Sequence, residues 1–193
     1  MVTSKQEYYI SPEEYIEGEK VSQFKHEYVD GQVYAMAGAS DAHVTISINL
    51  LTLLRNHIRS IGCRVYALDM KARIEIINRY YYPDIMITCD TRDREFEYYK
   101  CHPCLIVEVL SDSTEAIDRG KKFADYRHLE SLREYVLIAQ DTISVECFRR
   151  NDERRWVLYP YEKDEEVHLA SIDFRCSIAA LYEDVSFSVE ADS

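Results

Sequence analysis

Long hydrophobic runs are missing from this 193-residue sequence. No stretch approaches the ~20 apolar residues that span a bilayer, and residues 1–7 lack the apolar centre of a signal peptide. Basic residues are also scarce, because 23 Lys and Arg face 35 Asp and Glu, for a formal net charge of −12. We therefore expect a soluble, cytoplasmic protein with no membrane partner, and weak, salt-sensitive nonspecific binding to nucleic acid at most.

Sequence signatures of several enzyme classes are absent too. There is no G-x-S-x-G or Cys-His arrangement for covalent hydrolysis, and no P-loop or G-x-G-x-x-G for a nucleotide cofactor. No internal repeat, low-complexity tract or interdomain linker interrupts the chain. With 47% hydrophobic and 30% charged residues, the composition is typical of a globular protein. We expect a single domain over residues 1–193.

The apolar pattern predicts strands and helices in mixed order. Strands are expected in a hairpin over 26–36 that turns at Asp30-Gly31, and at 64–68, 72–77, 134–138, 144–149, 155–161 and 166–169. Helices are expected at 11–18, 42–61 and 114–129 from their caps and periodicity. Residues 91–100 are expected to form an exposed loop or short helix. For the 42–61 helix the predicted buried stripe is Val44, Ile48, Leu51, Leu54, Ile58 and Ile61.

Two short apolar runs each contain one carboxylate. Tyr81–Ile87 carries Asp84 after a proline, and Leu105–Leu110 carries Glu108. Such β-branched runs are typical of buried strands, where a carboxylate is costly unless it is paired or binds a cation. On neighbouring strands, the two would form a site for a hard cation such as Mg²⁺. Taken alone, Asp84 could equally cap a strand start, and Glu108 could be a solvated glutamate on a wet face.

Several pieces of the sequence resemble a known family. Pro83-Asp84 followed by Glu108-Val109-Leu110 resembles the PD-(D/E)xK nucleases. A longer ordered set, spread over roughly 11–182, is similar to the Uma-two family of putative restriction endonucleases. Its pieces are Glu27-Tyr28-Val29-Asp30-Gly31, Tyr82-Pro83-Asp84, Val107-Glu108-Val109-Leu110-Ser111 with Ser113-Thr114, Asp118-Arg119-Gly120-Lys121-Lys122 with Tyr126, and Glu134-Tyr135.

This resemblance implies an α/β fold with a restriction-endonuclease-like core, in which a central mixed β-sheet is flanked by α-helices. It implies a Mg²⁺-dependent endonuclease, with Mn²⁺ as a substitute ion, that hydrolyses DNA phosphodiester bonds. A homodimer is expected by analogy. The resemblance places the metal on Asp84, Glu108 and the carbonyl of Val109.

The lysine of the superfamily pattern is missing, because Leu110 occupies its position. The resemblance makes Lys122 the first candidate for a displaced lysine, on one helix face with Asp118 four residues earlier. Lys71 is the second candidate. Glu27 is a third acid that would bind the metal or hold a ligating water. Without the resemblance, Lys122 and Glu27 read as surface residues in ordinary charge pairs.

Two competing functions remain open from the sequence. The position of Leu110 and the acidic charge favour a catalytically inactive nuclease-fold module that binds or assembles. Cys101-His102-Pro103-Cys104 has the spacing of a redox or zinc motif, but it precedes a strand and has no second pair. The six cysteines are expected to be reduced and largely structural. His43 is expected to be a capping-region or core histidine; the family resemblance also places a histidine there, without a clear role.

Overall fold

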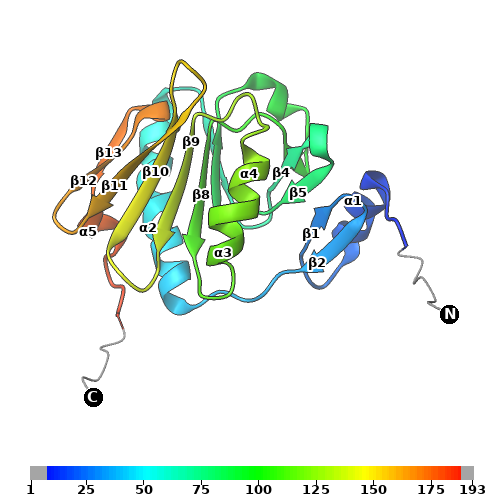
Figure 1. Cartoon of the computed structure of the whole chain (residues 1–193), viewed down its shortest axis with the longest axis horizontal. Coiled ribbons are helices and arrows are strands. Elements are labelled where there is room, and N and C mark those ends of the chain that lie inside the picture. The colour runs from blue at the N-terminus through cyan, green and yellow to red at the C-terminus, as the bar shows by residue number, and fades with distance from the viewer. Residues whose placement is uncertain (1–7, 188–193) are drawn as a thin grey trace.

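The computed structural model describes residues 8–187, and its centre is a six-stranded sheet (Figure 1). The strand order is β11-β10-β9-β8-β6-β3, in which β8 and β9 are parallel and the other neighbours antiparallel. The predicted mixed sheet is therefore confirmed, and the predicted strands in it agree to within a residue except at β6, which was predicted as part of a longer strand over Tyr81–Ile87. These strands are β3 (Arg64–Ala67), β6 (Ile85–Thr88), β8 (Leu105–Leu110), β9 (Glu134–Ala139), β10 (Ser144–Arg150) and β11 (Trp156–Glu162).

Helices cover both faces of this sheet, as expected, because alternate residues of each strand point to opposite sides. Ile85 and Val107 face the core that contains α2, α5 and the β12-β13 hairpin. Met86 and Ile106 face the second core, which contains Tyr126 of α4. In Figure 1, α2 lies behind the sheet and α3 and α4 lie in front. The elements are α2 (Asp41–His57), α3 (Glu115–Ile117), α4 (Phe123–Tyr126), β12 (Glu166–Leu169), β13 (Phe174–Ser177) and α5 (Ile178–Leu181).

A second sheet, of order β2-β1-β5-β4-β7, carries the N-terminal part of the described chain. The predicted hairpin is confirmed, because Val29 pairs with Gln32 and the turn residues Asp30 and Gly31 have φ values of 47° and 92°. Helix α1 begins at a capping box formed by Ser11 and Glu14. The elements are α1 (Pro12–Val21), β1 (His26–Val29), β2 (Gln32–Ala35), β4 (Lys71–Ile74), β5 (Arg79–Tyr81) and β7 (Tyr99–Lys100).

The buried face of α2 differs from the predicted stripe. Val44 and Ile48 are 44% and 56% exposed, whereas Ile46 and Leu50 are buried against the sheet. Both sides of this helix carry apolar residues, so hydrophobicity alone did not identify the side that meets the sheet. The helix also ends earlier than predicted, in the 3₁₀ turn η1 (Ile58–Ser60).

The predicted strand Tyr81–Ile87 is two strands. Tyr81 ends β5 in the second sheet, Ile85 begins β6 in the first, and Asp84 lies in the connection with Pro83. Proline has no N–H to donate to a sheet, which favours a break at this point. Asp84 therefore lies where the two sheets meet, rather than inside a strand as predicted.

Two other segments also depart from the predictions. The predicted helix over 114–129 consists of α3, a π-helical turn η4 (Asp118–Lys122) and α4. Residues 91–100, expected to be exposed, include the buried pair Asp93 and Lys100, in which the Lys100 ammonium donates to the Asp93 carbonyl at 2.9 Å. The remaining 3₁₀ turns are η2 (Glu75–Ile77), η3 (Thr91–Arg94) and η5 (Ala170–Ile172).

The expectation that all six cysteines are reduced is wrong for two of them. Cys63 and Cys89 form a disulfide, because they flank the paired strands β3 and β6 at the same end, with Cα atoms 4.1 Å apart. The expectation came from composition, which does not reveal strand pairing. Among residues 8–187, no helix is long and apolar enough to cross a bilayer.

Candidate active site

Glu108 projects from the middle of the six-stranded sheet toward α4. Its neighbours Val107 and Val109 face α2, so alternation places Glu108 on the opposite side. Its side chain is only 2% exposed. The Tyr126 hydroxyl donates to Oε1 at 3.1 Å, and the Asp84 N–H donates to Oε2 at 3.2 Å. The carboxylate is thus held from two sides inside the protein.

Asp84 is held next to Glu108 by reciprocal contacts with the backbone. While the Asp84 N–H donates to Glu108, the N–H of Val109 donates to Asp84 Oδ2 at 2.7 Å. The Asp84 side chain is 25% exposed, so it faces solvent more than Glu108 does. The structure therefore brings the two predicted carboxylates and Val109 together at the junction of the sheets.

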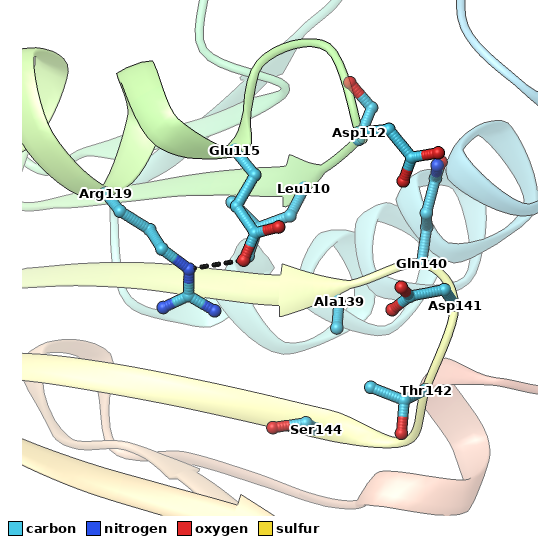
Figure 2. Close-up of a pocket in the computed structure, with 10 residues that line it drawn as sticks. Leu110, Asp112, Glu115, Arg119, Ala139, Gln140, Asp141, Thr142 and Ser144 are labelled. Carbon is cyan, nitrogen blue, oxygen red and sulfur yellow. Dashed lines mark hydrogen bonds and ion pairs between the residues drawn. The ribbon is translucent and has the colours of Figure 1, made fainter.

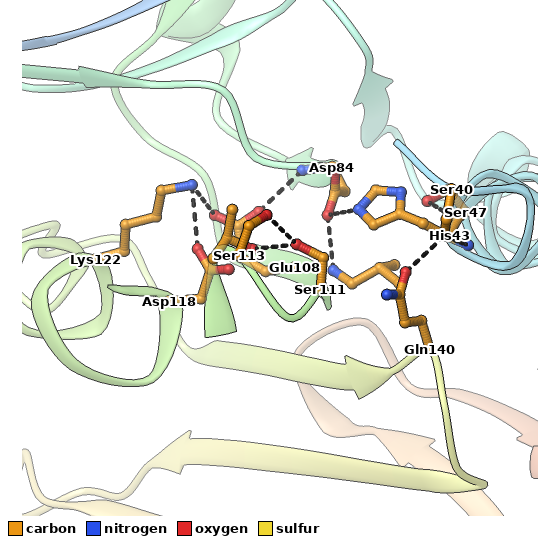
Figure 3. Close-up of polar contacts among 12 residues, drawn as sticks. Ser40, His43, Ser47, Asp84, Glu108, Ser111, Ser113, Asp118, Lys122 and Gln140 are labelled. Atoms are coloured by element: carbon orange, nitrogen blue, oxygen red, sulfur yellow. Dashed lines mark hydrogen bonds and ion pairs between the residues drawn. The ribbon is translucent and has the colours of Figure 1, made fainter. Parts of the chain in front are cut away.

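Lys122 reaches the same place from the π-helical turn, as Figure 3 shows. Its Nζ lies 2.8 Å from Glu27 Oε1, 3.2 Å from Asp118 Oδ1 and 3.5 Å from Glu108 Oε1. The side chain is 8% exposed, which excludes the reading of Lys122 as a solvated surface lysine. Glu27, on β1 of the second sheet, is brought in through this lysine. The cluster is therefore built from both sheets and the crossover between β8 and β9.

Lys71, the second candidate for the lysine, lies elsewhere. It is buried on β4 with its ammonium 4.8 Å from the centre of the Tyr82 ring. Of the two predicted lysines, Lys122 is the one that forms an ion pair with Glu108.

The electrostatics of the cluster are dominated by burial and by crowding of acids. Burial raises the pKa of Glu108 well above its ordinary value; Lys122 opposes this, while Asp118, Asp84 and Glu27 add to it. For Lys122, burial favours the neutral amine, but the surrounding carboxylates outweigh it and raise the pKa well above its ordinary value. The lysine is therefore charged, with the carboxyl groups of Glu27, Asp118 and Glu108 around its ammonium.

His43 is a member of the site whose role sequence reasoning left open. It lies in the first turn of α2, capped by Ser40, and its Nε2 is 3.2 Å from Asp84 Oδ2 (Figure 3). Burial lowers the pKa of His43, but the hydrogen bond and charge of Asp84 outweigh this and raise it. Asp84 Oδ2 thus meets donors from both β8 and α2, which leaves Oδ1 for another partner.

The donor set suits a hard divalent ion held partly by water. Asp84, Glu108 and the Val109 carbonyl offer only oxygen, which Mg²⁺ prefers, and Mg²⁺ commonly takes one or two carboxylates plus waters. The buried oxygens Glu27 Oε1 and Asp118 Oδ1 face the Lys122 ammonium, so these two acids pair with the lysine. Within 8–187, no three His, Cys, Asp or Glu side chains are arranged to hold a metal by themselves. The site is therefore suited to a hydrated ion that two carboxylates bind.

A polar pocket of about 210 Å³ opens beside the site, at the ends of the parallel strands β8 and β9 (Figure 2). Leu110 and Gln140 contribute to its wall, and Ser40, which caps the helix of His43, donates to Gln140. Figure 2 shows Arg119 reaching to Glu115 across one side. Its lining does not include Asp84, Glu108 or Lys122, so the pocket lies next to the cluster and is not part of it.

The fold resembles that of a protein whose crystal structure is known. A crystal structure from Anabaena variabilis, described as a putative nuclease belonging to DUF820, superimposes with a TM-score of 0.72 over 90% of this chain and 98% of that chain. The sequences are 17% identical, so this comparison shows the fold. The protein has the α/β fold of this class, with two acids and a lysine gathered at the junction of its sheets.

Sequence comparison then identifies the family. The profile of Uma2, described as putative restriction endonuclease, matches residues 12–179, and the chain belongs to this family. Two uncharacterized Synechocystis proteins are similar. One, slr1290, is 39% identical over 178 residues, covering 92% of this chain and 94% of its own. The other, sll1609, is 33% identical over 149 residues, covering 75% and 83%. The predicted family is confirmed.

Proposed function

We propose that this protein is a Mg²⁺-dependent endonuclease that hydrolyses phosphodiester bonds in DNA. The observation that carries the proposal is the position of Lys122, whose ammonium lies 3.5 Å from Glu108 although Leu110 occupies the usual lysine position. Membership of the Uma2 family supports a nuclease. In this proposal Asp84, Glu108 and the Val109 carbonyl hold the metal.

Bound Mg²⁺ or Mn²⁺ would supply a Lewis acid for the phosphoryl oxygen and a more acidic water. The residues of the chain provide the rest. Lys122 donates hydrogen bonds to the attacking water and offsets negative charge on the phosphoryl group. Its raised pKa keeps it protonated, so it serves as a donor and a positive charge. Glu27 and Asp118 hold the ammonium in place through the contacts described above.

His43 has a positioning role in this proposal. By donating to Asp84 Oδ2 together with the Val109 N–H, its ring leaves Oδ1 for the metal. Partners that fix the orientation of a ligating group commonly change metal affinity 10- to 100-fold (roughly) when they are lost.

Cleavage of a duplex requires two cuts, and we propose a homodimer. Val44 and Ile48 on the exposed side of α2 offer an apolar surface for a second copy. Sedimentation of the native protein and of Ile48→Glu tests this: the native protein should sediment as a dimer and the variant as a monomer. A native monomer would refute it.

The direct test is cleavage of supercoiled and linear DNA at low salt with Mg²⁺ or Mn²⁺. We expect the native protein to cut, and Glu108→Gln and Lys122→Ala to lose the activity. Lys163→Ala changes an exposed lysine and is the matched control. If Lys122→Ala cuts normally while Lys71→Ala does not, the lysine assignment is wrong.

A second candidate function is a catalytically inactive nuclease-fold module that binds or assembles. Leu110 at the lysine position and the net charge of −12 favour it. A native protein that neither cuts DNA nor binds Mn²⁺ would support this alternative. Mn²⁺ binding that is lost in Asp84→Ala, with the fold intact, would count against it.

A further inference from the structure

Three cysteines meet at one corner of the six-stranded sheet. Cys63 precedes β3, Cys89 follows β6 and Cys104 precedes β8, and these three strands are neighbours in the order β8-β6-β3. Cys63 and Cys89 are joined by a disulfide. The Sγ atom of Cys104 lies 3.7 Å from that of Cys89. A free thiol therefore contacts one sulfur of an existing disulfide.

Both cysteines of the Cys101–Cys104 motif are free thiols, and Cys104 points away from its motif partner toward Cys89. Cys104 is fixed by its backbone, whose N–H donates to Ile87 at 2.8 Å, and this carries its sulfur toward Cys89. The N–H groups of Cys101 and His102 instead donate to the buried Asp93. The second cysteine of the motif thus has Cys89 as its sulfur neighbour.

We propose that Cys63, Cys89 and Cys104 form a thiol–disulfide exchange site that reacts with low-molecular-weight thiols and disulfides. In the internal step, the Cys104 thiol releases its proton and the thiolate attacks Cys89 Sγ. The Cys89–Cys104 bond forms, the Cys63–Cys89 bond breaks, and Cys63 leaves as a thiolate that takes up a proton. The step is an isomerisation and needs no external oxidant.

Small reagents have a path to these sulfurs. A hollow of about 800 Å³ has both Cys89 and Cys104 in its wall, and Cys101 as well. Its basic residues are Arg73, Arg92, Arg133, His102 and His128, and its acidic residues are Glu75, Asp90 and Glu130. A carboxylate-bearing thiol of the glutathione type fits this mixed polar lining. Burial raises the pKa of Cys104 to about 11, so exchange at neutral pH is slow.

Exchange would change which strands are joined covalently. The Cys63–Cys89 bond ties β3 to β6, whereas a Cys89–Cys104 bond would tie β6 to β8. Asp84 precedes β6 and Glu108 lies in β8, so the second bond joins the two strands that position the acids. The proposal stands on the sulfur geometry alone and does not depend on nuclease activity.

The test uses peptide mapping of the full-length protein after alkylation without reductant. The protein is first incubated with glutathione disulfide, which takes two electrons from a pair of thiols and becomes two glutathiones. The native protein should give both Cys63–Cys89 and Cys89–Cys104 peptides. Cys63→Ser should convert fully to Cys89–Cys104, and Cys104→Ser should give Cys63–Cys89 alone.

Cys101→Ser is the matched control and should map like the native protein, because Cys101 is not one of the three contacting sulfurs. The proposal is overturned if Cys63→Ser leaves Cys89 and Cys104 separately alkylated or separately glutathionylated. It is also overturned if a Cys101–Cys104 peptide appears in place of Cys89–Cys104.

Discussion

Replacing Glu108 by glutamine should stabilise the metal-free protein. Glu108 is almost fully buried, and its pKa is raised by burial and by Asp118, Asp84 and Glu27. A carboxyl group with a raised folded-state pKa binds its proton more tightly when folded, so stability falls as pH rises above the unfolded-state value. At pH 8 the native protein bears this cost and the amide does not. Lys122 retains Glu27 and Asp118 as partners in the variant.

The expected gain is about 1–2 kcal/mol, at the low end of the range found when whole buried ion pairs are replaced by neutral residues, because Lys122 keeps two carboxylate partners here. For a chain of this size that corresponds to roughly 2–8 °C in Tm. The assay is urea unfolding at pH 8 in EDTA, with Glu130→Gln as the control at an exposed glutamate. The difference between native protein and variant should shrink as pH falls, because Glu108 then becomes protonated in the native protein as well.

Adding Mn²⁺ should make the native protein more stable than Glu108→Gln. A ligand that binds the folded state stabilises it by RT ln(1 + [L]/Kd), about 2.7 kcal/mol at 100-fold excess over Kd. The native protein should gain this amount, while Glu108→Gln gains little. The reasoning is refuted if Glu108→Gln is less stable than the native protein in EDTA, since burial of the charge would then cost nothing. If Glu108→Gln stays more stable than the native protein at saturating Mn²⁺, the metal assignment is refuted, whereas the argument about the buried charge still holds.

Three further changes give distinct outcomes. Lys122→Met should lower the unfolding free energy by about 3–5 kcal/mol, because buried carboxylates lose their cation, and urea unfolding measures it. His43→Ala should weaken Mn²⁺ binding roughly 10- to 100-fold with little loss of stability, and His43→Gln should recover part of the lost affinity. Calorimetric titration with Mn²⁺ measures both affinities. Asp93→Ala should lower the free energy of unfolding by about 2–4 kcal/mol, because three donors lose their acceptor. These donors are the Thr88 hydroxyl, which lies 2.6 Å from Asp93 Oδ2, and the N–H groups of Cys101 and His102. If the Asp93→Ala protein is as stable as the native protein, these hydrogen bonds do not stabilise the fold as argued.

Local patterns predicted the strands well, because their length and alternation are properties of short segments. Glu108 was recognised for the same reason, since a charge in Leu105–Leu110 conflicts with its apolar neighbours. The buried side of α2 was mispredicted, because Val44 and Ile46 are equally apolar and only the packed sheet distinguishes them. His43 could not be assigned a role, since its partner Asp84 is distant in the sequence and the local pattern around Ser40 indicates only a helix cap.

The placement of Lys122 depends on a feature that spacing rules do not contain. Asp118, Lys122 and Tyr126 are spaced by four and all contact the Glu108 region. In a regular α-helix, four residues overshoot a full turn by about 40°, so two such steps would rotate Tyr126 well away from Asp118. The π-helical turn over Asp118–Lys122 winds less per residue and offsets this overshoot. The irregular turn thus lets one crossover bring both the ammonium of Lys122 and the phenol of Tyr126 to the same buried carboxylate, so that a lysine outside β8 reaches Glu108.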